Sequence, residues 1–397
     1  MKRCHSFIFK FLNFYIVAIS MATVLTLSGC IEEYEADISS DDADLLVVEG
    51  SICSSRQNQF YLSRTLPVNS WQMPQMVTGA VLSVRGTDGS EYRAVDAGTG
   101  NYICQVGDLS PDVEYYLHIE SDGEVYESDP QKPLATEAIA EVVGVQDTPE
   151  SDIDVLVTPD EPFDASQTSY YLWTYDETWE VRPDYTTDLY YDTTLLMPIT
   201  KRGQFPERGW KNGKSTEILV AASNNYEDQH IRQLKLYDIS RRNERMYYRY
   251  SGLVRQRALS KAEYEYELAR KQASSEMGGL FTPLPSMLPS NIHCLTSSKH
   301  IIGFVGCSMN VSECRYFFDI HDFVIDRPTH GDDRVWVENP TAEYCCKLVS
   351  RGLYLCEWND ERDREGSLNT AWAYESQLDV RLRGAYVEKP DFWYDEY

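Results

Sequence analysis

Tyr170-Tyr171-Leu172-Trp173-Thr174-Tyr175 is the stretch that decides the fold, and Trp179-Glu180-Val181 follows it closely. Large rings of this kind are enriched in strands, and side chains two residues apart share a strand face. We expect Tyr171, Trp173 and Tyr175 to form core, although rings that contact a sugar or a protein partner would show the same pattern. The stretch therefore predicts a β-rich body with an aromatic core.

The residues before this stretch predict an antiparallel β-sandwich over residues 45–137. Its strand candidates are short and are separated by Asp-Gly and Gly-Thr-Gly turns. Leu109-Ser110-Pro111 followed by Tyr115-Tyr116-Leu117 resembles the corner of immunoglobulin and fibronectin-type sandwiches, where a tyrosine hydroxyl bonds to upstream backbone. His118 lies in the same strand candidate, and we expect it to be a half-exposed structural histidine.

Residues 138–397 predict a larger β-rich domain with a helical insertion at about residues 240–275. Residues 234–239 predict a strand that leads into a helix, with Ser240 as a possible N-cap and with apolar residues at helical spacing over residues 246–254. Ser260-Lys261-Ala262-Glu263 fits a capping box before a second helix. Consecutive strands of one meander are expected over residues 291–296, 301–308 and 314–320. The predicted fold class is mainly β: an N-terminal immunoglobulin- or fibronectin-like β-sandwich plus a larger β-rich second domain with one or two inserted helices.

The start of the chain predicts a lipoprotein signal peptide over residues 1–29. Residues 1–10 carry three positive charges and no acid, and residues 11–27 are mostly apolar. This run is shorter than the ~20 residues of a spanning helix, which argues against an uncleaved anchor. Leu27-Ser28-Gly29-Cys30 resembles a bacterial lipobox, in which small residues let the peptidase reach the bond beside the modified thiol. We expect Cys30 to carry the lipid that anchors the mature chain.

An acidic tether is expected over residues 30–44. Ile31 stands where some lipoproteins retained at the inner membrane have aspartate, and it is followed by Glu32, Glu33, Glu35 and Asp37. Such a tract resembles the surface-export signal of Bacteroidota lipoproteins, although a solvated flexible tether has the same composition. We expect a lipid-anchored protein of the outer membrane, exposed at the cell surface.

The charge of the chain excludes some classes of partner. Its 63 acidic and 36 basic residues give a net charge of −27. Affinity for nucleic acid comes largely from lysine and arginine on phosphates, so we expect no nucleic-acid partner. The same field opposes adsorption to anionic lipid headgroups, so membrane attachment must be covalent or by insertion.

The cysteines predict disulfides. Ten are present; one lies in the signal peptide and Cys30 is the lipidation site, which leaves an even set of eight in an oxidising compartment. Cys53 and Cys104 are the candidate pair of the first domain. Adjacent strand residues point to opposite faces, so Cys345 and Cys346 would bridge different partners. No C-x-x-C pair occurs, and we expect no metal site. Six cysteines stay unassigned: Cys294, Cys307, Cys314, Cys345, Cys346 and Cys356.

Three tyrosines are candidate partner or ligand contacts. Tyr185, Tyr190 and Tyr191 follow the aromatic stretch, and three aspartates flank them, which makes their burial difficult. Exposed tyrosines are frequent anchors of binding surfaces. They are therefore the contact residues that the sequence favours.

Catalytic and cofactor signatures are not found. The chain has no phosphate-binding glycine loop, H-E-x-x-H helix or G-x-S-x-G elbow. His321 and His330 lie near aspartates, which is expected by chance in so acidic a chain. The acids between residues 152 and 164 suit calcium but lack the spacing of an EF-hand loop. We expect no catalytic residue, no enzyme activity, and no cofactor besides the covalent lipid on Cys30.

The order of several short motifs resembles the Bacteroidota lipoprotein family known as domain of unknown function 4249. These motifs are Leu46-Val47-Val48-Glu49-Gly50, Tyr170-Tyr171-Leu172-Trp173, Gly278-Gly279-Leu280-Phe281, Asn291-Ile292 before Ile302-Gly303-Phe304-Val305-Gly306, and Lys389-Pro390-Asp391-Phe392-Trp393. Family members commonly carry Cys-x-x-Cys-Arg before the last motif. Here Asp379-Val380-Arg381 stands at that place, without the cysteines that a redox or metal role of the tail would use.

The resemblance implies an outer-membrane lipoprotein, typically encoded near TonB-dependent transporters, with no established catalytic activity. We therefore expect a non-enzymatic accessory or ligand-binding partner of a TonB-dependent transporter in nutrient uptake. A structural or adhesive surface lipoprotein is the alternative, and a hydrolase of surface glycans is the next.

Overall fold

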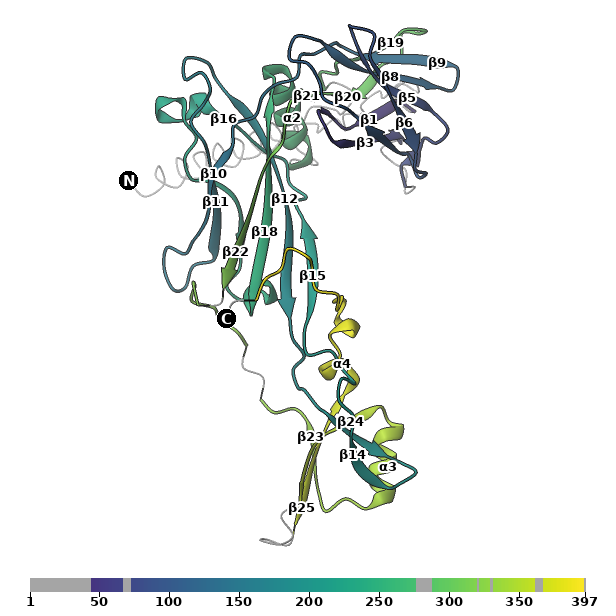
Figure 1. Cartoon of the computed structure of the whole chain (residues 1–397), viewed down its shortest axis with the longest axis vertical. Helices are drawn as coiled ribbons and strands as arrows, with labels where there is room; N and C mark the ends of the chain where they lie inside the picture. The colour runs from purple at the N-terminus through teal and green to yellow at the C-terminus, as the bar shows by residue number, and fades with distance from the viewer. Residues whose placement is uncertain are drawn as a thin grey trace, which may run out of the picture. The chain divides into compact units, whose positions relative to one another are not determined.

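The computed structural model describes residues 44–66, 73–275, 288–319, 321–328, 331–360 and 367–395 (Figure 1). The expected signal peptide, Cys30 and most of the tether lie outside these residues, as does His330. The chain from Asp44 onward forms one compact unit, and its fold is mainly β, which confirms the predicted class. None of the helices described is long and apolar enough to cross a membrane.

The N-terminal part is built on a ten-stranded, nearly closed sheet. The two strands at its ends, β19 and β20, contact each other. In sheet order the strands are β19 (Ile292–Cys294), β9 (Glu124–Ser128), β8 (Tyr115–Ser121), β5 (Val81–Gly86), β6 (Glu91–Asp96), β7 (Asn101–Gln105), β3 (Gln57–Arg64), β1 (Leu46–Glu49) and β20 (Ile301–Gly303), with β4 (Gln75–Met76) beside β3.

Two local predictions in this sheet are confirmed. The hydroxyl oxygen of Tyr115 accepts a hydrogen bond from the backbone N–H of Ser110 at 2.9 Å, which is the predicted corner. His118 is 5% exposed, and its ring nitrogens lie 2.8 Å from Glu127 and 3.2 Å from Glu120. Its partners hold it in the sheet, so it is structural as predicted, but it is buried and not half-exposed.

The expected meander over residues 291–320 is wrong. Its strands do not pair with one another in sequence order: β19 and β20 are the two end strands of the N-terminal sheet, β21 (Cys307–Ser308) pairs in parallel with β2 (Ile52–Cys53), and β22 (Ser312–Asp319) joins the central sheet. Each of these pairings joins strands far apart in the sequence, and local sequence carries no signal for such contacts.

The second part stacks two sheets on an aromatic core. One contains β15 (Gly209–Lys214), β12 (Tyr170–Val181), β18 (Arg249–Leu259) and β22, with β16 (Leu219–Ala222) beside β12. We call this the central sheet. The other contains β10 (Ile139–Val145), β11 (Ile153–Pro159) and β17 (Leu234–Ile239). Tyr171 and Trp173 are buried between them, and half-buried Tyr175 stacks on Tyr237 at 3.9 Å, so the predicted core face is confirmed.

A hydrogen-bond chain at the centre of this core ties three segments together. Trp173 and Gln256 are direct cross-strand partners, and the indole Nε1 of Trp173 donates to Gln256 Oε1 at 2.9 Å. Gln256 Nε2 in turn donates to the carbonyl oxygen of Glu137 at 3.0 Å. Trp173 and Gln256 are fully buried. An unpaired amide or indole would be costly there, so the chain favours a single register of β12 on β18.

Three tyrosine hydroxyls form a second polar cluster in the same core. Tyr237 is hydrogen-bonded to both Tyr250 and Tyr316, and Tyr250 donates to Glu177 Oε1 at 2.7 Å. Arg245 pairs with the same carboxylate oxygen at 2.5 Å. Burial raises the pKa of all three phenols, so they stay protonated and act as structural hydrogen-bond donors.

One of the two expected helices is present. Helix α2 (Lys261–Ser275) begins after Ser260, whose hydroxyl accepts the N–H of Glu263 at 3.1 Å, as the capping-box pattern predicts. The helix expected over residues 246–254 is wrong, because these residues lie largely in strand β18. Met246, Tyr250 and Val254 are four residues apart, a spacing that satisfies both a helix face and a strand face.

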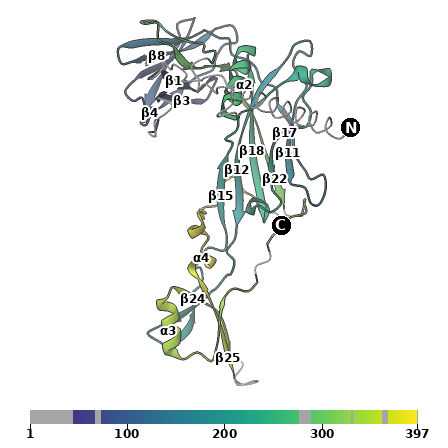
Figure 2. The same cartoon turned by 180° about the vertical axis from the view of Figure 1, so that it is seen from behind.

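A small C-terminal lobe has its own core. Strands β23 (Val335–Glu338), β25 (Leu368–Tyr374) and β24 (Leu353–Asp360) form its sheet, which α3 (Ala342–Ser350) and the hairpin of β13 (Leu189–Asp192) and β14 (Met197–Thr200) contact (Figures 1 and 2). Trp372 is fully buried in this core. Helix α4 (Glu375–Leu378) and the 3-10 turn Val380–Arg383 follow, and shorter 3-10 turns occur at Ser223–Asn225, Glu227–Gln229 and Glu244–Met246.

The end of the chain returns to the outer face of the central sheet, the face turned away from the aromatic core. Trp393 is 3% exposed, with its ring centroid 6.1 Å from that of Trp210 and 5.7 Å from that of Phe317. Its neighbour Phe392 is 36% exposed and lies 3.5 Å from the Arg315 guanidinium. The Lys-Pro-Asp-Phe-Trp motif therefore fastens the C-terminus to the sheet.

Replacing the buried ring of this motif should destabilise the protein more than replacing its exposed neighbour. We expect Trp393→Ala to lower the free energy of unfolding by about 3–5 kcal/mol, because it removes a large buried side chain. Phe392→Ala should cost about 1 kcal/mol. Urea denaturation of both variants measures the difference. Equal losses would show that Trp393 does not fasten the C-terminus.

Candidate functional site

The outer face of the central sheet carries polar side chains in register. Because alternate residues share a face, Leu172 and Thr174 of β12 point away from the core that holds Tyr171 and Trp173. Leu172 pairs with Arg257 of β18, and Thr174 pairs with Arg255. The same strand alternation that builds the aromatic core therefore lines up two arginines on the opposite side.

A second wall faces these arginines from the N-terminal part. It is formed by the segment between β1 and the start of β3, residues 50–59. Asn58 fixes this segment, since its side chain accepts the N–H of Cys53 at 2.9 Å and donates to the Cys53 carbonyl at 2.9 Å. Gly50 has φ +143°, and a Cβ there would lie 2.6 Å from the Phe60 ring, so this position requires glycine.

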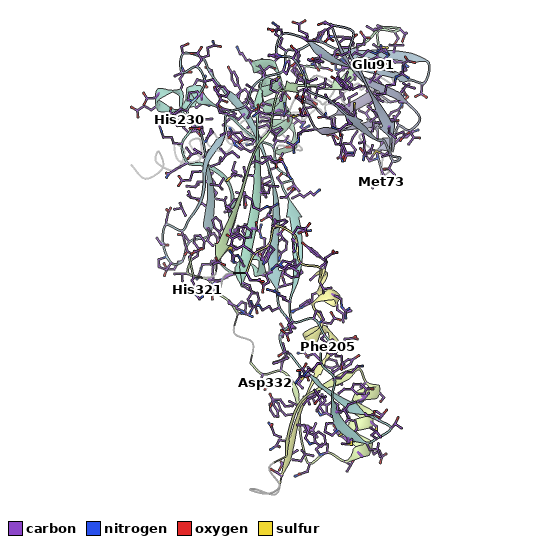
Figure 3. All side chains as sticks on the ribbon, viewed as in Figure 1. Met73, Glu91, Phe205, His230, His321 and Asp332 are labelled. Carbon is purple, nitrogen blue, oxygen red and sulfur yellow. The ribbon has the colours of Figure 1, made fainter. Side chains whose placement is uncertain are left out.

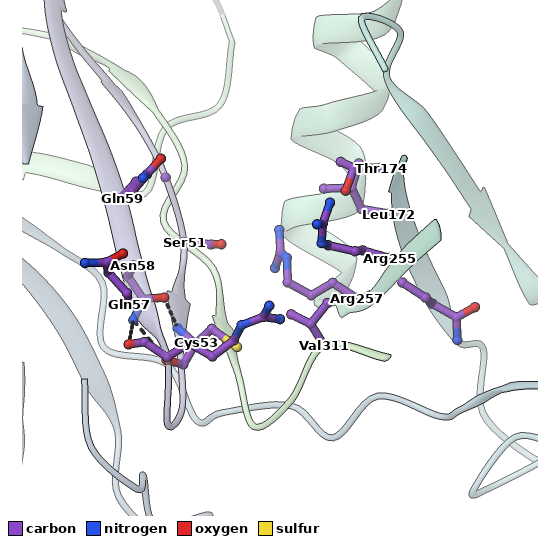
Figure 4. Close-up of a pocket in the computed structure, with 13 residues that line it drawn as sticks. Ser51, Cys53, Gln57, Asn58, Gln59, Leu172, Thr174, Arg255, Arg257 and Val311 are labelled. Carbon is purple, nitrogen blue, oxygen red and sulfur yellow. Dashed lines mark hydrogen bonds between the residues drawn. The ribbon is translucent and has the colours of Figure 1, made fainter. Parts of the chain in front are cut away.

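Between the two walls lies a pocket of about 360 Å³, which we call the arginine pocket (Figure 4). Arg255 and Arg257 point from β18 toward Ser51 and Cys53 across the gap. Its volume is in the range of small-molecule sites. The pocket is lined by Gly50, Ser51, Cys53, Arg56, Gln57, Asn58, Gln59, Leu172, Thr174, Arg255, Gln256, Arg257 and Val311. Three of these side chains are cationic and none is acidic, in a chain of net charge −27.

Carboxylates placed behind the pocket hold two of the arginines. Glu313 of β22 accepts from Arg56 Nη2 at 2.6 Å and from Arg255 Nε at 3.3 Å, so one acid joins the two walls. Arg255 Nη1 also contacts Asp176 at 2.7 Å. Although partial burial opposes it, the hydrogen bond from Arg56 and the charges of Arg56 and Arg255 lower the pKa of Glu313. Glu313 is therefore ionised at neutral pH.

The third arginine belongs to a buried pair. Arg257 Nη2 donates to Glu263 Oε1 at 2.6 Å, and Arg257 Nη1 lies 3.5 Å from Ser308 Oγ. Glu263 is the residue whose N–H is capped by Ser260 at the start of α2. The pair therefore links β18 to the helix, and breaking it would leave a buried charge without its partner.

The three candidate tyrosines do not lie in this pocket. Tyr185 is half-buried; its hydroxyl donates to Asp333 at 2.7 Å and Arg334 stacks on its ring at 4.8 Å. Lys201 lies 5.0 Å from the half-buried ring of Tyr190. Tyr191 is 2% exposed in the core of the small lobe, which corrects its assignment as a contact residue. Tyr190 and Tyr191 are adjacent in β13, so only one of them can face outward.

The expected disulfide is not formed. Cys53 and Cys104 are both buried free thiols, and burial raises the pKa of each. Cys345 and Cys346 lie in helix α3, not in a strand, so the argument from opposite strand faces does not apply to them. The other cysteines of the described residues are free as well: Cys294, Cys307, Cys314 and Cys356.

In the part of the chain that the structure describes, the histidines and acids do not form a group that could hold a metal ion. His321 is exposed near the end of β22 (Figure 3), and the carboxylate of its neighbour Asp322 accepts the backbone N–H of Asp319 at 2.8 Å. Asp152 and Asp154, from the acidic segment considered for calcium, contact the backbone of Arg241 and the amine of Lys235. Among the described residues, no three His, Cys, Asp or Glu side chains are placed to hold a metal ion.

Sequence reasoning missed the arginine pocket because β18 was expected to be helical. In a strand, Arg255 and Arg257 lie on one face and Gln256 on the other. This alternation is the sequence pattern that could have placed the two arginines on a common strand face. Arg56 carries no comparable signal, since the pairings that bring residues 50–59 to β18 are long-range.

Comparison with known families shows a match over most of the chain. The model of the family described as domain of unknown function DUF4249 matches residues 31–313. The matched range includes both walls of the arginine pocket. A search of the curated proteins finds no match to the chain.

The cysteine environments predict which thiol reacts first. Partial burial opposes ionisation of Cys294, but hydrogen bonds with Ser297 and Thr296 lower its pKa, whereas burial raises the pKa of Cys53 and Cys104. Because the thiolate is the nucleophile, iodoacetamide at neutral pH should label Cys294 of the native protein first.

Mass spectrometry of the labelled protein measures this order. The variant Cys294→Ser is the control and should lose the fast phase. A native mass lower by two hydrogens, with Cys53 and Cys104 joined in one peptide pair, would contradict the free-thiol arrangement.

Proposed function

The chain belongs to the DUF4249 family, and from that premise we propose that it is a non-enzymatic outer-membrane lipoprotein that binds a small ligand for a TonB-dependent transporter. Cys30 carries the anchor in this proposal, and the body faces the outside of the cell. The transporter is the partner that receives the ligand in nutrient uptake.

The arginine pocket is the observation that carries the ligand-binding role. It is built from two parts of the chain, the segment of residues 50–59 and the outer face of β12 and β18. Its Arg56 and Arg255 side chains are partly exposed and are held by Glu313. A recess whose charged groups are fixed in advance loses little entropy when a ligand binds.

The chemistry of the pocket suits binding better than turnover. Cys53 is the one thiol that lines it, and burial raises the pKa of that thiol, which makes it a weak nucleophile. No histidine is among the residues that line the pocket. A side chain that could act as a base near neutral pH is thus lacking beside the thiol.

The lipobox-like sequence and the acidic residues after it support the location. A second acyl chain makes anchoring durable, since one chain alone binds a bilayer only marginally. The charge of −27 opposes adsorption of the body to anionic headgroups. Covalent lipid is therefore the attachment that fits this composition.

Removal of the lipidated thiol tests the location and the partner together. Cys30→Ala should abolish lipidation, so the protein should leave the detergent-soluble membrane fraction, and a TonB-dependent transporter should no longer co-purify with it in mild detergent. Cys294→Ser is the matched control, and it should be lipidated, retained in the membrane and co-purified with the transporter as the wild-type protein is. Unchanged membrane retention of Cys30→Ala would contradict the anchor, and purification of the control without any transporter would contradict the partner.

A further inference from the structure

The three arginines of the pocket have N–H groups that the contacts described above do not use. A guanidinium has five donors. Arg56 uses Nη2, Arg255 uses Nε and Nη1, and Arg257 uses Nη2 and Nη1 in the contacts given above. The contacts given above do not use the Nε and Nη1 atoms of Arg56, the Nη2 atom of Arg255 or the Nε atom of Arg257. These atoms are the donors that a ligand can engage.

The carboxylates behind the arginines position these donors without occupying them. Glu313 and Asp176 sit on the strands at either side of β18, Glu313 directly opposite Arg255 in the register. They contact the guanidinium groups and do not line the pocket. Part of the entropic cost of ordering the long arginine side chains is therefore already included in the folded protein before a ligand binds.

The composition of the lining separates two classes of polar ligand. Protein sites for neutral sugars present aromatic rings on which the sugar stacks, and no aromatic side chain is among the residues that line this pocket. Guanidinium groups, by contrast, match the planar geometry of carboxylate and phosphate oxygens and bond to them in pairs. The rest of the lining includes the amides of Gln57 and Gln59 and the apolar side chains of Leu172 and Val311.

We propose that the arginine pocket binds a small molecule through an oxyanion, a carboxylate or a phosphate group, held between Arg56 and Arg255. Arg257 is the fixed third cation, and Leu172 and Val311 contact the remainder of the molecule. This inference rests on the proposed function only in treating the pocket as a ligand site; neither the lipid anchor nor the transporter enters it.

Long-range attraction does not explain such binding, because the chain as a whole repels anions. The affinity must come from short charge-assisted hydrogen bonds, which are roughly twice as strong as neutral ones. A single change at Arg255 should therefore have a large effect, although the net charge of the protein barely changes.

Isothermal titration calorimetry of the full-length protein in detergent tests the proposal. The probes are inorganic phosphate, succinate and citrate, with glucose as the neutral control, each at up to millimolar concentration. We expect saturable binding of phosphate or of the carboxylates and none of glucose. Competition between phosphate and citrate tells which oxyanion the pocket prefers.

Two pocket variants and one control locate the binding. Arg255→Gln should weaken binding at least tenfold. Thr174→Asp places a carboxylate opposite Arg255 at an exposed position and should also abolish binding, which covers the case in which loss of the arginine perturbs folding. Arg93→Gln removes a largely exposed arginine outside the pocket and should leave binding unchanged. Circular dichroism confirms that each variant is folded.

The outcomes that overturn the proposal are definite. It fails if none of the oxyanions binds, if glucose binds as well as they do, or if binding survives both Arg255→Gln and Thr174→Asp. Failure of the proposed function looks different: the oxyanion then binds as expected, but no transporter co-purifies with the protein.

Discussion

The structure depends on the register in which β12 pairs with β18. The two strands are partners from Tyr170 and Leu259 to Trp179 and Tyr250, and the buried hydrogen bonds from Trp173 to Gln256 and on to Glu137 hold that alignment. A slip of one residue would carry every side chain of a strand to the opposite face. The aromatic core would then meet solvent, and the arginines would be buried.

Each face of the central sheet has one role because of this register. The inner face packs its rings and the tyrosine hydroxyl cluster against β10, β11 and β17. The outer face is covered at one end by Trp393, which lies against Phe317, and at the other end it meets residues 50–59. The C-terminal motif and the arginine pocket therefore lie on the same face of the central sheet, at different places along its strands.

The sequence predicts the parts of this arrangement that depend on local chemistry. Tyr171 and Trp173 are recognisable as core, Tyr115 as a corner, and Ser260 as a helix cap, because each is decided by neighbours within a few residues. The pairing of β19 and β20 with strands of the N-terminal sheet has no such local signal. The arginine pocket combines both cases, since Arg255 follows from strand alternation, whereas Arg56 reaches the site only through long-range pairing.

A double-mutant cycle on Trp173 and Gln256 tests the register most directly. Trp173→Phe leaves the buried amide oxygen of Gln256 without its donor, and Gln256→Leu leaves the indole N–H and the Glu137 carbonyl unpaired. The double variant removes both indole and amide, so its loss of unfolding free energy should be smaller than the sum of the single losses by about 1–2 kcal/mol. Losses that add to within about 0.5 kcal/mol would contradict the account.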